Sequence, residues 1–270
     1  MRINRTRQRL EQGEVVFGCS IQQFGCAEVA RLLGAAGFDF VFLDAEHGPF
    51  DLETLHALIR ACLERDVTPI VRVGDLQYTL VARALDAGAQ GVIFPRVESP
   101  SLLREAVRWT RFPPEGVRGY GLTPPQLDYE ARSFAEIIEH VNANTLVVVQ
   151  FETQAAIERR EELLATPGMD VALVGPADLS IALGVPGEFE HPKLVGTVLA
   201  LMESCERHGV APGIQVRTPA LAKKWVERGM RFVGCGSEHG LLWEKARQTA
   251  TELKALAEQL RAREPREAQM

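Results

Sequence analysis

Eight short apolar runs recur along the chain, separated by longer segments in which apolar residues have helical spacing. This alternation is typical of repeated strand and helix units around a parallel sheet. Eight strands within 270 residues favour a closed (β/α)8 barrel, or TIM barrel, over an open doubly wound sheet. We predict the strands at residues 15–20, 40–44, 69–73, 91–94, 146–151, 170–175, 211–216 and 232–235.

One barrel domain is expected over residues 1–263, followed by a polar tail at 264–270. Residues 241–263 form a long amphipathic helix whose broad apolar stripe needs a surface to cover. A stretch rich in proline and glycine, residues 112–128, is long for a connection in such a fold. We interpret this stretch as a functional loop at the rim of the pocket.

Charge and cysteine content exclude several classes of partner. The net charge is −6 and the cationic residues are scattered, so nucleic acid is not an expected partner. The five cysteines form no Cys-x-x-Cys pair, which argues against disulfides and thiolate zinc and favours the cytoplasm. No apolar stretch approaches the roughly 20 residues that span a bilayer, and the N-terminus has no apolar signal segment.

Two acids directly follow two consecutive predicted strands. Glu152 comes after the run at 146–151, and Asp178 comes after the run at 170–175. The carboxyl ends of parallel strands build the active site in such folds, so the pair indicates a site for a divalent metal ion. Oxygen donors favour Mg²⁺ or Mn²⁺. The alternative is that each acid caps the helix or turn that follows it.

Other polar residues near strand ends suggest catalytic roles. Among the six histidines His47 is the best-placed base, because it lies in a Gly- and Pro-containing loop after the second strand. Arg72 within an apolar strand requires an acid or a bound anion, and a buried structural salt bridge is the alternative. None of the five lysines falls at a strand end, which argues against Schiff-base chemistry and favours a metal as electron sink.

Several motifs together resemble the HpcH/HpaI aldolase family over nearly the whole chain. They are FLDAEHGP at 42–49, VR at 71–72, LDAGA at 85–89, PPEGVRG at 113–119, QFET at 150–153 and GPADLS at 175–180. The resemblance implies a class II, metal-dependent pyruvate aldolase (an aldehyde-lyase) on a (β/α)8 barrel. It implies Mg²⁺ or Mn²⁺, with Co²⁺ as a further possibility, and no Schiff-base lysine.

The resemblance also implies a role for each matching residue. Glu152 and Asp178 would hold the metal, and Arg72 would steady the enolate oxygen. His47 would be the base, with Asp86 raising its basicity, although Asp86 could equally be a solvated or capping acid. The residues expected to contact the substrate are Gln150, Gly175, Pro176, Ala177 and Arg118.

Two positions depart from the pattern of many family members. Ala45 replaces a glycine, which we expect to matter little for the mechanism. Cys19 stands where many relatives carry a larger or aromatic residue, so the resemblance does not extend to pocket size and aldehyde preference.

The predicted reaction is reversible cleavage of a 4-hydroxy-2-oxo acid to pyruvate and an aldehyde through a metal-stabilised enolate. A citrate-lyase-type or malyl-CoA-type lyase is the enzymatic alternative, but no basic cluster marks a coenzyme A phosphate site. The other alternative is a non-catalytic barrel used for ligand binding or assembly. The resemblance implies a homo-oligomer, commonly a hexamer, with the C-terminal helix exchanged or packed between subunits.

Overall fold

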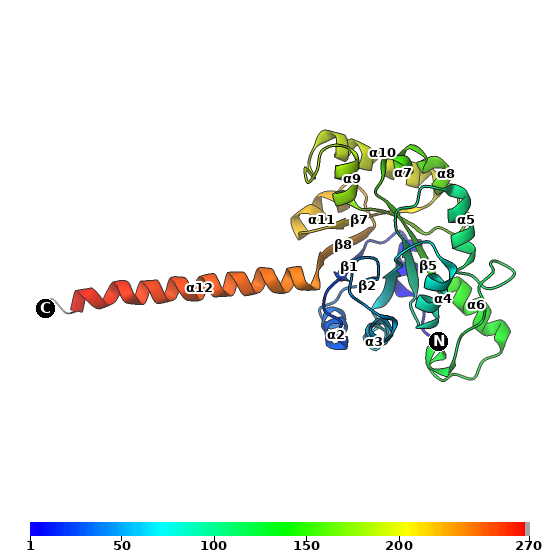
Figure 1. Ribbon diagram of the computed structural model, residues 1–270, viewed down its shortest axis with the longest axis horizontal. Coiled ribbons are helices and arrows are strands. Elements are labelled where there is room, and N and C mark those ends of the chain that lie inside the picture. The colour runs from blue at the N-terminus through cyan, green and yellow to red at the C-terminus, as the bar shows by residue number, and fades with distance from the viewer. Residues whose placement is uncertain (268–270) are drawn as a thin grey trace.

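A closed barrel of eight parallel strands forms the centre of the molecule, and its strand order follows the chain from β1 to β8 (Figure 1). The computed structural model describes residues 1–267. The strands are β1 (Val16–Ile21), β2 (Phe40–Asp44), β3 (Thr68–Arg72), β4 (Gly91–Phe94), β5 (Leu146–Phe151), β6 (Val171–Val174), β7 (Ala211–Val216) and β8 (Phe232–Ser237). The predicted (β/α)8 fold is confirmed, and the strand ends differ from the prediction by no more than two residues.

Helices surround the barrel, and several begin at side chains suited to that position. Asp51, Ser99, Ser133, Thr153 and Thr218 each accept a hydrogen bond from a backbone N–H in the first turn. The helices are α1 (Arg5–Glu11), α2 (Ala27–Ala35), α3 (Leu52–Leu63), α4 (Tyr78–Asp86), α5 (Pro100–Arg108), η1 (Pro124–Leu127), α6 (Phe134–Asn144), α7 (Gln154–Glu158), α8 (Arg160–Leu164), α9 (Pro176–Ala182), α10 (Pro192–His208), α11 (Pro219–Val226) and α12 (Glu238–Glu267).

The interior of the barrel is filled at the amino ends of its strands. The rings of Phe40 and Phe232 stack there with centroids 4.1 Å apart. Gly18 makes room for them, because a Cβ at this position would lie 2.1 Å from the Phe40 ring. Leu10 of α1 joins the same apolar cluster, and the Thr6 hydroxyl of this helix donates to the Asp39 carbonyl at 3.1 Å. Because these side chains fill the amino end of the barrel, the pocket must lie at the carboxyl ends of the strands.

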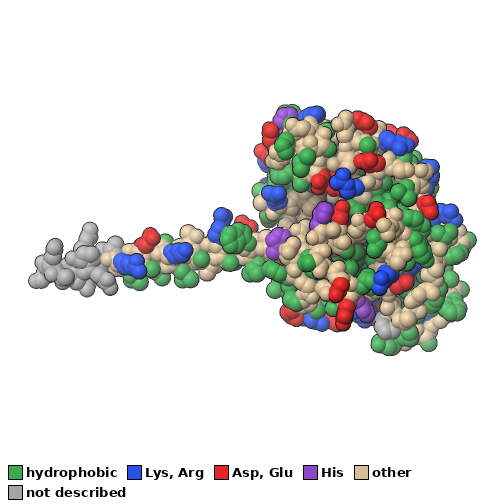
Figure 2. Space-filling view, viewed as in Figure 1, with side chains coloured by type: hydrophobic (Ala, Val, Ile, Leu, Met, Phe, Trp, Pro, Cys, Tyr) green, Lys and Arg blue, Asp and Glu red, His purple; other side chains and the backbone are tan. Residues whose placement is uncertain are grey.

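The last helix leaves the barrel and projects into solvent (Figures 1 and 2). It starts three residues before the predicted residue 241 and runs to Glu267, past the predicted end at 263. Residues 268–270 of the predicted tail lie outside the described residues. The stripe is exposed along this helix, as the apolar side chains Leu241, Leu242, Trp243, Leu253, Leu256 and Leu260 show. Within residues 1–267, no helix is both long and apolar enough to cross a membrane.

Candidate active site

A cavity of about 690 Å³ opens at the carboxyl ends of the strands. Polar residues from several strands line it, and they include most of those that the sequence singled out for substrate and metal. The predicted residues in its wall are Arg72, Gln150, Gly175, Pro176, Ala177 and Asp178. The eightfold repeat therefore brings together side chains that are more than a hundred positions apart in the sequence.

Glu152 is buried beside this cavity and has two hydrogen-bond donors. One carboxylate oxygen accepts the backbone N–H of Arg96 at 3.0 Å, and the other accepts the side-chain amide of Gln150. Burial raises the pKa of Glu152, and repulsion from the carboxylates of Asp178 and Glu46 adds to the shift, while the Arg96 N–H opposes it. Several negative charges therefore meet here.

The capping alternatives find little support. Thr153 caps helix α7, because its hydroxyl oxygen accepts the Ala156 N–H at 3.1 Å, so Glu152 is not the cap. Asp178 lies in the first turn of α9, and among the described residues its side chain has no hydrogen-bond or ion-pair partner. It lines the cavity with its carboxylate unsatisfied by protein. Both acids are thus available to a ligand.

Arg72 is held in place by two acids that the prediction did not include. Its Nε and Nη2 atoms bind the two carboxylate oxygens of Asp44 at 3.1 and 2.6 Å, and Nη1 lies 3.0 Å from Oε2 of Glu46. This is the buried salt bridge considered as the alternative. Because Arg72 also lines the cavity and its Nη1 reaches the Gln150 side-chain oxygen at 3.5 Å, the ion pair and a role in the site coexist.

Asp44 also shapes the loop that follows β2. Its Oδ1 atom accepts the backbone N–H groups of Glu46 and His47, both at 3.1 Å. Oε2 of Glu46 is buried without a hydrogen-bond partner among the described side chains, although it lies within ion-pair distance of Arg72. The sequence did carry a signal for both acids, since they fall in the motif at 42–49 and one of them ends an apolar strand.

His47 lies on the same loop with a solvent-exposed ring. Its side chain is 70% exposed, and its Nε2 atom is 3.8 Å from Oε2 of Glu46. The predicted pairing with Asp86 is wrong within the described chain, because Asp86 binds Nη2 of Arg118 at 2.7 Å. Asp86 ends α4, and a helix that returns to the start of the next strand ends at the amino side of the barrel.

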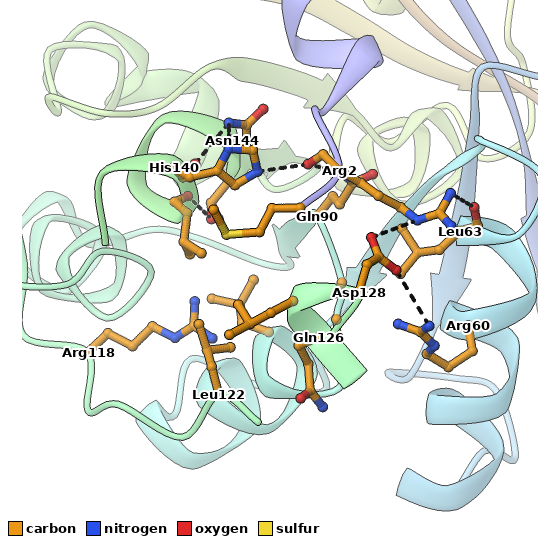
Figure 3. Close-up of a pocket in the computed structure, with 17 residues that line it drawn as sticks. Arg2, Arg60, Leu63, Gln90, Arg118, Leu122, Gln126, Asp128, His140 and Asn144 are labelled. Atoms are coloured by element: carbon orange, nitrogen blue, oxygen red, sulfur yellow. Dashed lines mark hydrogen bonds and ion pairs between the residues drawn. The ribbon is translucent and has the colours of Figure 1, made fainter. Parts of the chain in front are cut away.

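The loop at 112–128 lies at this amino side as well, so its prediction as a pocket rim is wrong for the single chain. Figure 3 shows Arg118, Leu122 and Gln126 around a cavity of about 70 Å³ that Arg2 and His140 also line. None of the loop's described residues lines the large cavity. The reason is the position of the loop in the chain. It follows helix α5 and leads through α6 to the start of β5, so it lies at the end of the barrel where strands begin. Arg118 is therefore not placed to bind substrate in the same subunit.

The region after β1 is shaped by an acid that the prediction overlooked. The carboxylate of Glu238, at the start of α12, accepts the backbone N–H groups of Gln22, Gln23 and Phe24 at 2.6–3.0 Å. This bridge links the first and last elements of the barrel. Cys19 is fully buried and does not line the cavity, so its size does not set the pocket wall; Ser20 and Gln22 do line it.

These features define an enzyme of the (β/α)8 class with carboxylates, an amide and a fixed guanidinium around an open cavity at the carboxyl ends of its strands. The chain belongs to the HpcH/HpaI aldolase/citrate lyase family, whose sequence profile matches residues 25–244. The resemblance seen in the motifs is thereby confirmed.

Individual relatives are similar over most of their length. A hydroxypyruvate/pyruvate aldolase from Roseobacter denitrificans is 32% identical over 257 residues, covering 93% of this chain and 98% of the relative. A 5-keto-4-deoxy-D-glucarate aldolase from Klebsiella pneumoniae is 33% identical over 264 residues, covering 93% and 97%. The crystal structure of a family member from Burkholderia cenocepacia superposes with a TM-score of 0.86 at 33% identity, covering 93% and 99%.

Proposed function

We propose that the protein is a divalent-metal-dependent aldolase that reversibly cleaves a 4-hydroxy-2-oxo acid to pyruvate and an aldehyde. One observation supports this most directly: Arg72, Gln150 and Asp178 converge in one cavity beside Glu152. No lysine is among the described residues that line the cavity, so an imine has no amine there. The relatives named as aldolases support an aldol reaction.

The residues present fit a hard divalent cation such as Mg²⁺ or Mn²⁺. Glu152 and Asp178 would hold it: the pKa of Glu152 is raised partly by the neighbouring carboxylates, and the described residues offer Asp178 no hydrogen-bond or ion-pair partner. Within residues 1–267, no cluster of three or more His, Cys, Asp or Glu side chains is arranged to hold a metal. Two protein ligands leave coordination positions for water and substrate oxygens. A bound cation would polarise the 2-oxo group and so stabilise negative charge on the adjacent carbon.

The chain's own residues would bind and orient the substrate. The Arg72 guanidinium, fixed by Asp44, would donate to the oxygen on which charge develops. Gln150 and the backbone of α9 at Ala177 would position the carboxylate end of the 2-oxo acid. His47, exposed beside the site, would take the proton from the C4 hydroxyl as the carbon–carbon bond breaks.

The test combines metal binding with turnover. Purified protein is mixed with pyruvate and a panel of aldehydes, with Mg²⁺ or Mn²⁺ and with EDTA, and aldol products are measured. Glu152→Gln and Asp178→Asn should weaken Mn²⁺ binding in calorimetry by at least the 10–100-fold typical of outer-sphere partners, and turnover should fall with it. Glu158→Gln is the control, because this exposed acid of α7 has Gln154 as its one side-chain partner among the described residues.

Metal-independent turnover would contradict the proposal, and so would Mn²⁺ binding that survives both substitutions. Turnover that requires coenzyme A thioesters instead of free aldehydes would favour a citrate-lyase-type reaction. The oligomeric state is measured in the same preparation by light scattering, where a hexamer is expected. A single species near the chain mass of 29.8 kDa would contradict that expectation.

A further inference from the structure

A second arginine lines the cavity, and the described residues place no acid beside its guanidinium. Arg217 directly follows β7, and it shares the cavity wall with Arg72 and Asp178. Its guanidinium lies over the Phe189 ring, 5.5 Å from the ring centroid. Among the described residues no carboxylate lies within ion-pair distance of it and no hydrogen bond involves its side chain. In contrast, Arg72 forms ion pairs with Asp44 and Glu46.

The contact with the Phe189 ring leaves the N–H groups of Arg217 open to a ligand. A guanidinium on an aromatic face is held by the ring, while its N–H donors point outward in its own plane. These donors match the paired oxygens of a carboxylate or a phosphate. Arg217 is therefore oriented by Phe189 without being neutralised, as an anion-binding side chain should be.

The cavity also has more room than pyruvate needs. Its volume of about 690 Å³ lies within the roughly 300–1,000 Å³ typical of sites for larger ligands. His239 and Arg247 line it together with Arg217, while the acids in its wall are Asp178, assigned above to the metal, and Glu244 on α12. A substrate held at Arg72 can thus extend toward a region with two arginines and one remaining acid.

We propose that Arg217 binds an anionic group, carboxylate or phosphate, at the end of the acceptor aldehyde remote from the reacting carbon. This inference rests on the proposed aldolase function and adds a substrate class to it. The enzyme then prefers acceptors that carry a terminal negative charge. Arg217 is a residue that determines specificity, and it takes no part in breaking the carbon–carbon bond.

Binding is measured first, with ligands that cannot react. Calorimetry in the presence of Mn²⁺ measures the affinity for a series of 2-oxo dicarboxylates, from 2-oxopentanedioate to 2-oxooctanedioate. Each is compared with the 2-oxo monocarboxylate of the same chain length. None of these ligands can be cleaved, because all lack the C4 hydroxyl. At least one dicarboxylate should bind the wild-type protein more tightly than the monocarboxylate of the same length. Arg217→Met should lower the ratio of these two affinities by about 10–100-fold. Arg217→Lys should keep part of it.

The matched control is Arg228→Met. Arg228 is also exposed and stacks on a ring, 5.1 Å from the centroid of Trp225, but it does not line the cavity. Its loss should leave the preference unchanged. If Arg228→Met reproduces the effect, or if Arg217→Met weakens both ligands of each pair equally, the inference is wrong.

Turnover measurements then show whether the anionic group is a carboxylate or a phosphate. They also test the Arg217 site independently of the proposed aldolase function. Aldol addition of pyruvate to 5-oxopentanoate is compared with pentanal, and glyceraldehyde 3-phosphate with glyceraldehyde. The pair whose kcat/KM ratio falls in Arg217→Met, mainly through KM, identifies carboxylate or phosphate as the group. If no aldehyde reacts while the dicarboxylate preference depends on Arg217, the aldolase proposal fails and the anion site stands. Ratios equal to wild type in both pairs would overturn the inference.

Discussion

The substitution Gly175→Ala tests how closely the site is packed. Gly175 follows β6, and a Cβ built there would lie 2.8 Å from both Nε2 of Gln150 and Oε2 of Glu152. Ordinary contacts of such an atom begin at 3.4 Å, so both side chains must move away from the new Cβ by about 0.6 Å. The backbone itself accepts alanine, because its φ of −94° is unstrained. The perturbation therefore acts on the side chains of the site.

Neither side chain can move without loss. Glu152 accepts the Arg96 N–H and the Gln150 amide, and Gln150 in turn contacts Arg72. Overpacking of a filled region costs about 1–3 kcal/mol, and a misplacement approaching 1 Å at a reacting centre costs up to about 100-fold in rate. We expect Gly175→Ala to fold, to lose about 1–3 kcal/mol in urea denaturation, and to lose at least tenfold in kcat/KM.

The assays are Mn²⁺ calorimetry, steady-state aldol cleavage and urea denaturation followed by circular dichroism. Gly196→Ala is the control, because a Cβ at this position in α10 meets nothing within 4 Å. It should be neutral or slightly stabilising, since alanine favours a helix over glycine by up to about 1 kcal/mol. A Gly175→Ala protein with wild-type Mn²⁺ affinity and wild-type kcat/KM would refute the packing argument.

Three further predictions concern the surroundings of the site and the assembly. Asp44→Asn breaks the buried pair with Arg72 and should cost about 3–5 kcal/mol in chemical denaturation, together with loss of turnover; unchanged stability would contradict this. Glu161 has its pKa lowered to about 2, first by the Ser204 hydroxyl and then by His208 and Arg207. The stability it contributes is present above its unfolded pKa and is lost as pH falls toward 2, so Glu161→Gln should flatten the decline between about pH 5 and pH 2 in acid denaturation curves; parallel curves would contradict this. Leu256→Glu on the exposed stripe of α12 should shift light scattering toward smaller species, and an unchanged mass would argue against a role of the stripe in assembly.

The repeat pattern in the sequence predicts the fold well because each strand is a short apolar run. Deviations occur where a polar residue borders a run. Asp170 was included in the sixth strand, but it precedes Val171 and its carboxylate accepts the Val147 N–H at 2.7 Å. This interaction joins residues 23 positions apart, next to two neighbouring strands, so local alternation does not reveal it.

The site is predicted less completely, and the errors have a geometric cause. Strand-end residues such as Gln150 and Asp178 were placed in the cavity because the barrel fixes where strand ends lie. Within the described chain, Asp86 and Arg118 lie at the opposite end of the barrel from the cavity, which a sequence motif does not reveal. Asp44 was missed because its partner Arg72 lies opposite it on the neighbouring strand. The sequence does not state the register in which β2 and β3 pair.

Charge balance then suggests an order of binding. Arg72 carries one positive charge against the four carboxylates of Asp44, Glu46, Glu152 and Asp178, a net charge of −3 when all are ionised. Such a site repels a 2-oxo acid, because unit charges about 4 Å apart at an effective dielectric constant near 20 interact by about 4 kcal/mol. A divalent cation changes the net charge from −3 to −1 and provides a positive centre beside the arginine. We therefore expect pyruvate to give no saturable heat in calorimetry with EDTA and to bind once Mn²⁺ is present; equal affinity in both conditions would show that the arginines of the cavity attract the anion without the cation.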